Sequence, residues 1–306
     1  MLSWITHNRL YDLARRGRRL TPWWAMLPLA WLMFLLASLF GLPAAVALLV
    51  AEEEGALGSP ALSGLLNGLL LALSFGGLIL LVWLWVRLYE KRGFATLGFE
   101  RRSALGQYGR GLLIGLLSFL AAVGLLGALG YVAPEAGDPG RSGQVGLAVL
   151  AGALLVIPGW LVQGAAEEVL TRGWMLPTLA ARYRPWIGVA VSSLFFAAAH
   201  SFNPNLSALA LVNLLLYGLF AAFYALREGS LWGICGFHAV WNWAQGNLFG
   251  LQVSGAELGG GMLFDLMETG PDWFTGGAFG PEGGLAVTGV LLLGIGLLVG
   301  WRRPTG

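Results

Sequence analysis

Long apolar runs separated by short polar stretches dominate the chain. Each run is long enough for a helix that crosses the apolar core of a bilayer, which is about 30 Å thick and takes about 20 helical residues. The runs cover residues 24–50, 62–86, 108–132, 145–178, 186–202, 207–226, 231–250 and 284–301. Because they are continuous and lack the alternation of barrel strands, they predict helices. The pattern therefore predicts an all-α polytopic membrane protein with about eight transmembrane helices.

The fourth run, residues 145–178, is too long for one simple crossing. It contains Pro158 and Gly159. Proline removes a backbone donor and crowds the preceding turn, so we expect a kink or break at this point.

Composition supports the membrane assignment. Of the 306 residues, 57% are hydrophobic and 11% are charged, and the mean hydropathy is +0.72. A soluble domain carries about 25% charged residues. The heavy use of Ala, Gly, Leu and Arg with a single lysine is typical of a bacterial source, so we expect the cytoplasmic membrane of a bacterium.

Basic residues fall almost entirely on one side of the predicted helices. Every Lys and Arg except Arg141 precedes the first run, follows the last, or lies in or flanks a turn on the same side as these ends. The other side carries mainly acidic residues, many of them in the Gly-rich loop 251–283, which we expect to be a cap or a mobile segment. By the positive-inside rule both termini are cytoplasmic. The arginines are spread over several short loops, which does not indicate a nucleic-acid surface.

Few ionisable or strongly polar side chains interrupt the predicted helices. The fourth, fifth and seventh runs carry Glu167, Glu168, Arg172, His200, His238 and Asn242. Such groups cost about 2.5–3.5 kcal/mol each on insertion scales and usually mark function. Counting residues from the Arg184 turn places Glu167 and His200 at nearly equal depth, with His238 and Asn242 at the same depth or slightly shallower. We therefore expect side chains from three helices to converge.

The spacing within each helix assigns partners. Glu168 and Arg172 are four residues apart, so they share a face and can form an ion pair, whereas Glu167 points elsewhere. Phe196 is four residues before His200, so its ring can pack against the imidazole. His238 and Asn242 have the same spacing and can direct two donors at one point.

These groups fit two kinds of chemistry. A glutamate beside a neutral histidine can deprotonate a water molecule. A second histidine and an asparagine amide can donate hydrogen bonds to a carbonyl oxygen as it becomes an oxyanion. The residues alone leave a hydrolase and a proton or ion relay of a transporter equally open.

Three short motifs resemble those of a known family. EEVLTR at 167–172, FAAAH at 196–200 and HAVWN at 238–242 match, in order, the motifs EExxxR, FxxxH and HxxxN/B of the CPBP family. This family, also called Abi, comprises the CAAX proteases and bacteriocin-processing enzymes. The resemblance covers residues 150–250 and implies a glutamate-type intramembrane endopeptidase.

The resemblance also implies roles. Glu167 would activate water with His200, and His238 and Asn242 would form the oxyanion hole. Glu168, Arg172 and Phe196 match supporting positions. The chain then divides into a basic arm with three helices (1–143), a catalytic core of four helices (144–250), and the external loop with the last helix (251–306).

Several alternatives stay open. Family members described as scaffolds or immunity factors suggest a non-catalytic protein that binds a membrane partner. No cofactor is expected, although Glu167, His200 and His238 could form a zinc site in a metal-dependent version of the hydrolase. Cys235, three residues before His238, could form a Cys–His dyad.

Other intramembrane protease types fit poorly. The sequence has no HExxH motif, no aspartate in a predicted helix and no GxSxG-like serine.

The expected partners are the bilayer and a peptide or membrane-protein substrate, lipidated or not, but no nucleic acid. We expect the substrate to enter from the cytoplasmic side, near the basic face. The sequence does not indicate the oligomeric state.

Overall fold

The computed structural model describes residues 3–101, 103–135 and 145–300. Short helices α1 (Ser3–Thr6) and α2 (Arg9–Arg15) precede a long hairpin of α3 (Trp23–Glu53) and α4 (Pro60–Trp85). A π-helical turn (Val86–Glu90) ends α4, and α5 (Ala104–Ala128) follows. The fourth apolar run forms α6 (Leu150–Leu155), α7 (Ile157–Glu168), a π-helical turn (Val169–Met175) and α8 (Leu176–Arg182).

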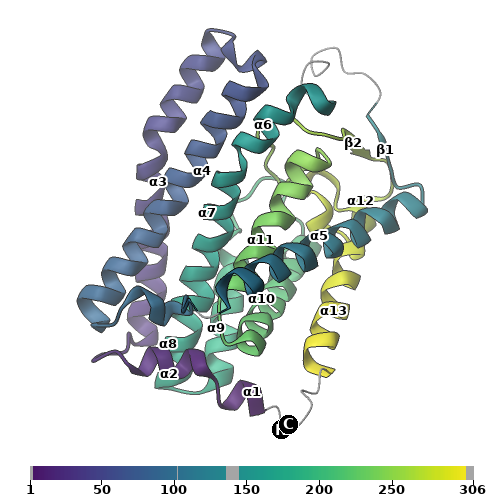
Figure 1. The fold of residues 1–306 in the computed structure, drawn as a ribbon. Coiled ribbons are helices and arrows are strands. Elements are labelled where there is room, and N and C mark those ends of the chain that lie inside the picture. The colour runs from purple at the N-terminus through teal and green to yellow at the C-terminus, as the bar shows by residue number, and fades with distance from the viewer. Residues whose placement is uncertain (1–2, 102, 136–144, 301–306) are drawn as a thin grey trace.

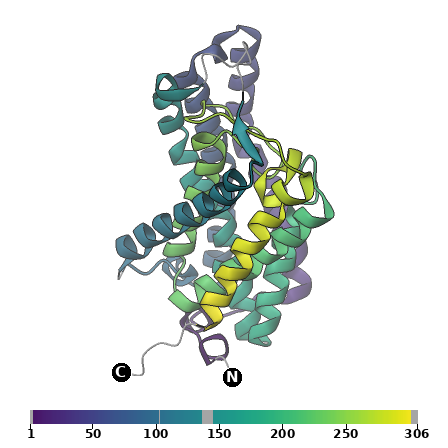
Figure 2. The ribbon, with the colours of Figure 1, turned by 90° about the vertical axis from the view of Figure 1, so that its right-hand side faces the viewer.

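The second half of the chain completes the bundle (Figure 1). It contains α9 (Pro185–Ala199), α10 (Ala208–Glu228), α11 (Trp232–Trp243) with a π-helical turn (Ala244–Leu248), and α13 (Leu285–Gly300). The loop before α13 holds α12 (Asp272–Thr275) and strand β2 (Leu266–Glu268), which pairs antiparallel with β1 (Val132–Pro134). Helix α11 packs against α5 and α7, and α10 packs against α9 and α13. Figure 2 shows α10 and α13 side by side.

The prediction of an all-helical membrane protein is confirmed in its main part. Within the described residues, four helices are long and apolar enough to cross a membrane: Trp23–Glu53, Pro60–Glu90, Ala104–Ala128 and Ala208–Glu228. A bent pair, Gly146–Leu155 and Ile157–Arg182, makes a fifth if it is one span. Pro185–Ala199 and Leu285–Gly300 are shorter apolar helices. Each predicted run is helical, but eight crossings stay a prediction.

The break predicted in the fourth run is present. The two parts of that run are bent by 48° relative to each other, and Val156 separates α6 from α7. Pro158 occupies the first turn of α7, where its missing N–H would have no partner within the helix. The proline therefore starts a new helix, and the chain changes direction just before it.

The basic segments meet at one end of the bundle. Asn8 donates a hydrogen bond to the carbonyl of Leu226, Arg182 to that of Leu20, and Arg227 to that of Leu298. The amino-terminal helices, the α8–α9 turn, the α10–α11 turn and the end of α13 therefore lie together, at the bottom of Figure 1. We call this the basic end. Which side of a membrane it faces stays a prediction.

The β1–β2 pair and the α3–α4 turn lie at the opposite end of the molecule (Figure 1). Arg102, Arg141, Arg302 and Arg303, which entered the charge argument, lie outside the described residues, as does the predicted boundary at 143/144. Loop 251–283, expected to be a cap or a mobile segment, has defined structure, with β2, α12 and two short 3₁₀ turns.

Candidate active site

Helices α7 and α11 approach each other closely beside the motif residues. A Cβ atom on Gly164 would lie 2.8 Å from the backbone nitrogen of Ala239, so only glycine allows this contact. Small residues at helix crossings permit such close approach in membrane proteins. Glu167 lies one turn after Gly164, and His238 is adjacent to Ala239. The crossing thus brings the carboxylate and the imidazole to the same place.

The predicted ion pair between Glu168 and Arg172 is present and fully buried. Nη1 of Arg172 lies 3.3 Å from both carboxylate oxygens of Glu168. The guanidinium also donates to the carbonyl of Gly218 at 3.0 Å and lies over the ring of Phe196, 4.7 Å from its centroid. These contacts join three helices, because Arg172 follows α7, Phe196 lies on α9 and Gly218 on α10.

His238 lies between the two glutamates. Its Nδ1 is 3.0 Å from Oε1 of Glu168, and its Nε2 is 3.7 Å from Oε2 of Glu167. An ionised carboxylate can only accept, so Nδ1 carries a hydrogen and donates it to Glu168. The ring of Tyr217 packs against the imidazole with centroids 5.1 Å apart. Glu168 therefore fixes the orientation of this ring and the hydrogen on Nδ1.

A chain of hydrogen bonds holds Glu167. Asn242 donates from Nδ2 to Oε1 of Gln163 at 2.8 Å, and Gln163 donates from Nε2 to Oε1 of Glu167 at 2.9 Å. The other carboxylate oxygen of Glu167, Oε2, is buried and makes no hydrogen bond within the described part of the chain. This oxygen is the one nearer His238, and it can accept a hydrogen bond from a water molecule.

His200 ends helix α9. Its Nδ1 lies 2.8 Å from the carbonyl oxygen of Phe196, and the two rings have centroids 4.8 Å apart, so the predicted contact between them is present. A carbonyl only accepts, so Nδ1 donates and Nε2 of the neutral ring is an acceptor.

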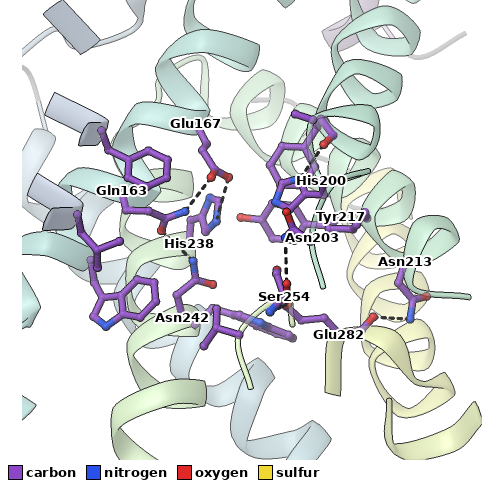
Figure 3. Close-up of a pocket in the computed structure, with 18 of the residues that line it drawn as sticks. Gln163, Glu167, His200, Asn203, Asn213, Tyr217, His238, Asn242, Ser254 and Glu282 are labelled. Carbon is purple, nitrogen blue, oxygen red and sulfur yellow. Dashed lines mark hydrogen bonds and ion pairs between the residues drawn. The ribbon is translucent and has the colours of Figure 1, made fainter. Parts of the chain in front are cut away.

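The four predicted catalytic residues line one pocket of about 260 Å³ (Figure 3). Glu167, His200, His238 and Asn242 all contribute to its wall. Glu168 and Cys235 are buried but do not line it. Most of the remaining wall is apolar and includes Phe34, Leu71, Phe75, Leu214, Val287 and Leu291. The convergence expected from helix depth is therefore present, while the catalytic roles of the four residues stay predictions.

Loop residues complete the pocket. Glu282 accepts hydrogen bonds at its Oε2 from the backbone nitrogen of Ser254 at 2.8 Å and from its hydroxyl at 2.6 Å. Asn203 donates to the carbonyl of Ser254 at 2.9 Å. Burial raises the pKa of the Glu282 carboxyl, and the hydrogen bonds from Ser254 oppose this in part. The pocket thus has a second carboxyl group, away from Glu167.

The comparisons with known proteins agree with the motif order. Residues 149–244 match the family model described as "Type II CAAX prenyl endopeptidase Rce1-like". This confirms the resemblance to the CAAX proteases over that segment. The matched segment contains Glu167, His200, His238 and Asn242. Because the matched family is one of proteases, the match supports a peptidase.

One curated relative was found. A segment of 67 residues is 43% identical to an "Uncharacterized 24.3 kDa protein" of Escherichia coli. It covers 21% of this chain and 30% of that protein. No solved structure matches the chain.

The zinc site considered at Glu167, His200 and His238 has no geometric support. Among the described residues, no group of three His, Cys, Asp or Glu side chains is arranged to hold a metal ion. Asn242 lies beside these groups in the pocket. Its side chain is an amide, which suits hydrogen bonding better than metal binding. The metal-dependent alternative stays a prediction.

Sequence reasoning missed Gln163, Ser254 and Glu282. Gln163 could have been identified from the sequence, because it is the one strongly polar residue in the apolar run before Glu167 and lies one turn from it. Ser254 and Glu282 could not, because they are separated by a loop and meet only in the folded chain. The expected entry of substrate near the basic face also finds no support, since the loops that line the pocket lie at the other end.

Proposed function

We propose that this chain is an intramembrane endopeptidase that hydrolyses a peptide bond with a water molecule activated by Glu167 and His200. The observation that carries the proposal is the convergence of Glu167, His200, His238 and Asn242 on one pocket. The protease family matched by residues 149–244 supports it independently.

Water activation needs two acceptors that have no hydrogen-bond donor of their own. Within the described residues, Oε2 of Glu167 is buried and makes no hydrogen bond, and Nε2 of His200 can accept because Nδ1 donates to the carbonyl of Phe196. A water molecule between them would lose a proton to Glu167 as its oxygen bonds to the carbonyl carbon of the substrate. When the tetrahedral intermediate collapses, the carbon–nitrogen bond breaks and the amine takes up that proton.

Stabilisation of the oxyanion needs donors. An asparagine amide has two N–H groups, and Asn242 uses one for Gln163, so the other is available. His238 can donate from Nε2 only as an imidazolium, because Nδ1 already donates to Glu168. The carboxylates of Glu167 and Glu168 face the ring, so a positive charge there has partners. Together these donors would form the oxyanion hole.

The remaining motif residues support these groups. Glu168 holds His238, Arg172 holds Glu168, and Phe196 packs against both Arg172 and His200. Glu168 and Arg172 do not line the pocket, and Phe196 contributes only an apolar ring to its wall. Their role in the proposal is to fix the geometry of the pocket, as rigid neighbours do in other active sites.

The substrate proposed is a peptide or a segment of a membrane protein. The apolar part of the pocket wall can bury apolar side chains near the bond that is cut. The matched family is described as a CAAX prenyl endopeptidase, and we include a lipidated peptide in the proposal. The proposed setting is the bacterial cytoplasmic membrane.

The test compares membranes that contain the wild-type protein with membranes that contain Glu167→Gln. Protein amino termini generated by the wild type should be absent with the variant, while Glu52→Gln, an exposed carboxylate far from the pocket, should behave as wild type. Equal sets of amino termini from wild type and Glu167→Gln would favour the non-catalytic scaffold or immunity protein.

A zinc-dependent version of the hydrolase makes a separate prediction. The proposed chemistry uses a carboxylate, two imidazoles and an amide without a metal ion. Cleavage should therefore survive exhaustive chelation. Loss of cleavage on chelation, with recovery when zinc is returned, would support the metal-dependent alternative.

A further inference from the structure

The pocket lies far from the basic end of the bundle. Helix α9 starts at Pro185, beside the basic α8–α9 turn, and runs for 15 residues before His200. At 1.5 Å per residue this places His200 about 22 Å from that turn. Glu167 lies 15 residues before Arg182 along α7 and α8, which gives a similar depth. In an apolar layer about 30 Å thick, both residues are nearer the opposite surface.

Helix α13 gives the same result, whereas α11 places its pocket residues nearer the middle of the bundle. Helix α13 begins directly after the loop that holds Glu282, and its 16 residues end where Arg227 donates to the carbonyl of Leu298. Glu282 is therefore about 24 Å from the basic end. Asn242 follows the start of α11 by ten residues, or about 15 Å. The pocket extends from the middle of the bundle towards the end away from the arginines.

The loops that line the pocket all belong to that far end. They contribute Asn203, Val253, Ser254, Leu258 and Glu282. No segment of the basic end contributes to the pocket wall described by the structure, and neither does any Lys or Arg side chain. Glu167 and Glu282 are its two carboxyl groups (Figure 3).

We propose that the pocket takes its substrate from the non-cytoplasmic side of the membrane, and that the substrate is a membrane-associated polypeptide segment that has already been translocated. The loops that line the pocket lie at the end away from most of the described basic residues, and the positive-inside rule places that basic end in the cytoplasm. The assignment of the pocket as an active site rests on the proposed function. The side of the membrane that the pocket faces does not rest on it.

Cysteine accessibility tests the sidedness without any need for turnover. Cys235 is the one cysteine in the sequence and is buried, so Cys235→Ala gives a background for single reporters. Ser201→Cys follows His200 in an exposed loop, Leu258→Cys lies in the pocket wall, and Ser3→Cys reports the basic end. The probe is a membrane-impermeant maleimide added to intact spheroplasts of the expressing bacterium.

The proposal predicts that Ser201→Cys and Leu258→Cys are labelled in intact spheroplasts, whereas Ser3→Cys is labelled only after the membrane is permeabilised. The reverse pattern would overturn it. Adding Glu167→Gln to each reporter should leave the labelling unchanged, because labelling does not depend on catalysis. If the pattern holds but Glu167→Gln retains cleavage, the proposed function fails and the sidedness stands.

Discussion

The imidazole Nδ1 of His238 lies 3.0 Å from Oε1 of Glu168, and the same carboxylate lies 3.3 Å from the guanidinium of Arg172. Glu168 does not line the pocket, but it connects the buried Arg172 to His238, which does line it. Glu168 and Arg172 are both fully buried, so each charge depends on the other. The motif EExxxR therefore combines one glutamate for the pocket with a second that holds His238 in place.

Breaking this ion pair should destabilise the protein strongly. Glu168→Gln leaves the charge of Arg172 buried without its carboxylate, which costs about 3–5 kcal/mol in comparable sites. The double variant Glu168→Gln, Arg172→Met removes both charges and should unfold at a higher temperature than Glu168→Gln alone. Thermal unfolding in detergent measures this. A single variant as stable as the wild type would contradict the ion pair as a stabilising contact.

Gln163→Ala should slow cleavage without unfolding the protein. It removes the hydrogen bond that orients Glu167 and the acceptor for Asn242. Hydrogen bonds to charged groups contribute about 1.5–3 kcal/mol, which corresponds to a loss of about 10- to 100-fold in rate. Asn67→Ala, an amide on α4 bonded to Ser63, is the matched control and should cleave at the wild-type rate. Equal rates for both variants would exclude a positioning role for Gln163.

The close crossing of α7 and α11 can be tested at Gly164. In Gly164→Ala the new methyl group would meet the backbone of Ala239 at 2.8 Å, so the helices must move apart. Overpacking of this kind costs about 1–3 kcal/mol, and the shift should separate Glu167 from His238 and reduce cleavage. Gly124→Ala on α5 has no atom within 4 Å of the new methyl group and should lose nothing. If Gly164→Ala cleaves as fast as Gly124→Ala, the crossing does not set the geometry of the site.

The β1–β2 pair should loosen as the pH rises. Burial raises the pKa of Glu268 in β2 from 4.5 to about 7, and the charge of Asp272 adds to this. The folded loop therefore favours the protonated carboxyl, so its stabilising effect is complete below pH 4.5 and is lost as the pH rises through about 7. Hydrogen exchange of the β1 and β2 amides should be faster at pH 8 than at pH 5.5, once corrected for the intrinsic rate.

Glu268→Gln should remove that pH dependence, because the amide does not titrate. Glu257→Gln, an exposed acid in the same loop, should retain it. A pH dependence that persists in Glu268→Gln would show that another group is responsible.

Much of the fold could be predicted because apolar runs define helices in a membrane. The break before Pro158 followed from the missing N–H of proline, and the helix ends agree with the runs to within a few residues in most cases. The π-helical turn Val169–Met175 could not be predicted, because nothing in its composition distinguishes it from an α-helix. The predicted eight crossings stay a prediction, since Pro185–Ala199 and Leu285–Gly300 are short for spans.

The site shows a similar division. Polar residues are rare in the apolar helices, where their burial is costly and usually marks function. The sequence therefore identifies Glu167, His200, His238 and Asn242. Glu282 is an acidic residue in a loop full of acidic residues, and only its contact with Ser254 distinguishes it. Contacts of this kind depend on the path of the loop, which short-range patterns do not encode.

The central claim is that Glu167 activates water in this pocket. Its most direct test is cleavage, by purified protein in lipid vesicles, of a peptide that spans a bond found in the membrane comparison. Glu167→Gln should cleave about 100- to 10,000-fold more slowly than the wild type, as expected for loss of a general base, while Glu52→Gln cleaves normally and both variants unfold at the wild-type temperature. Cleavage by Glu167→Gln at the wild-type rate would contradict the account.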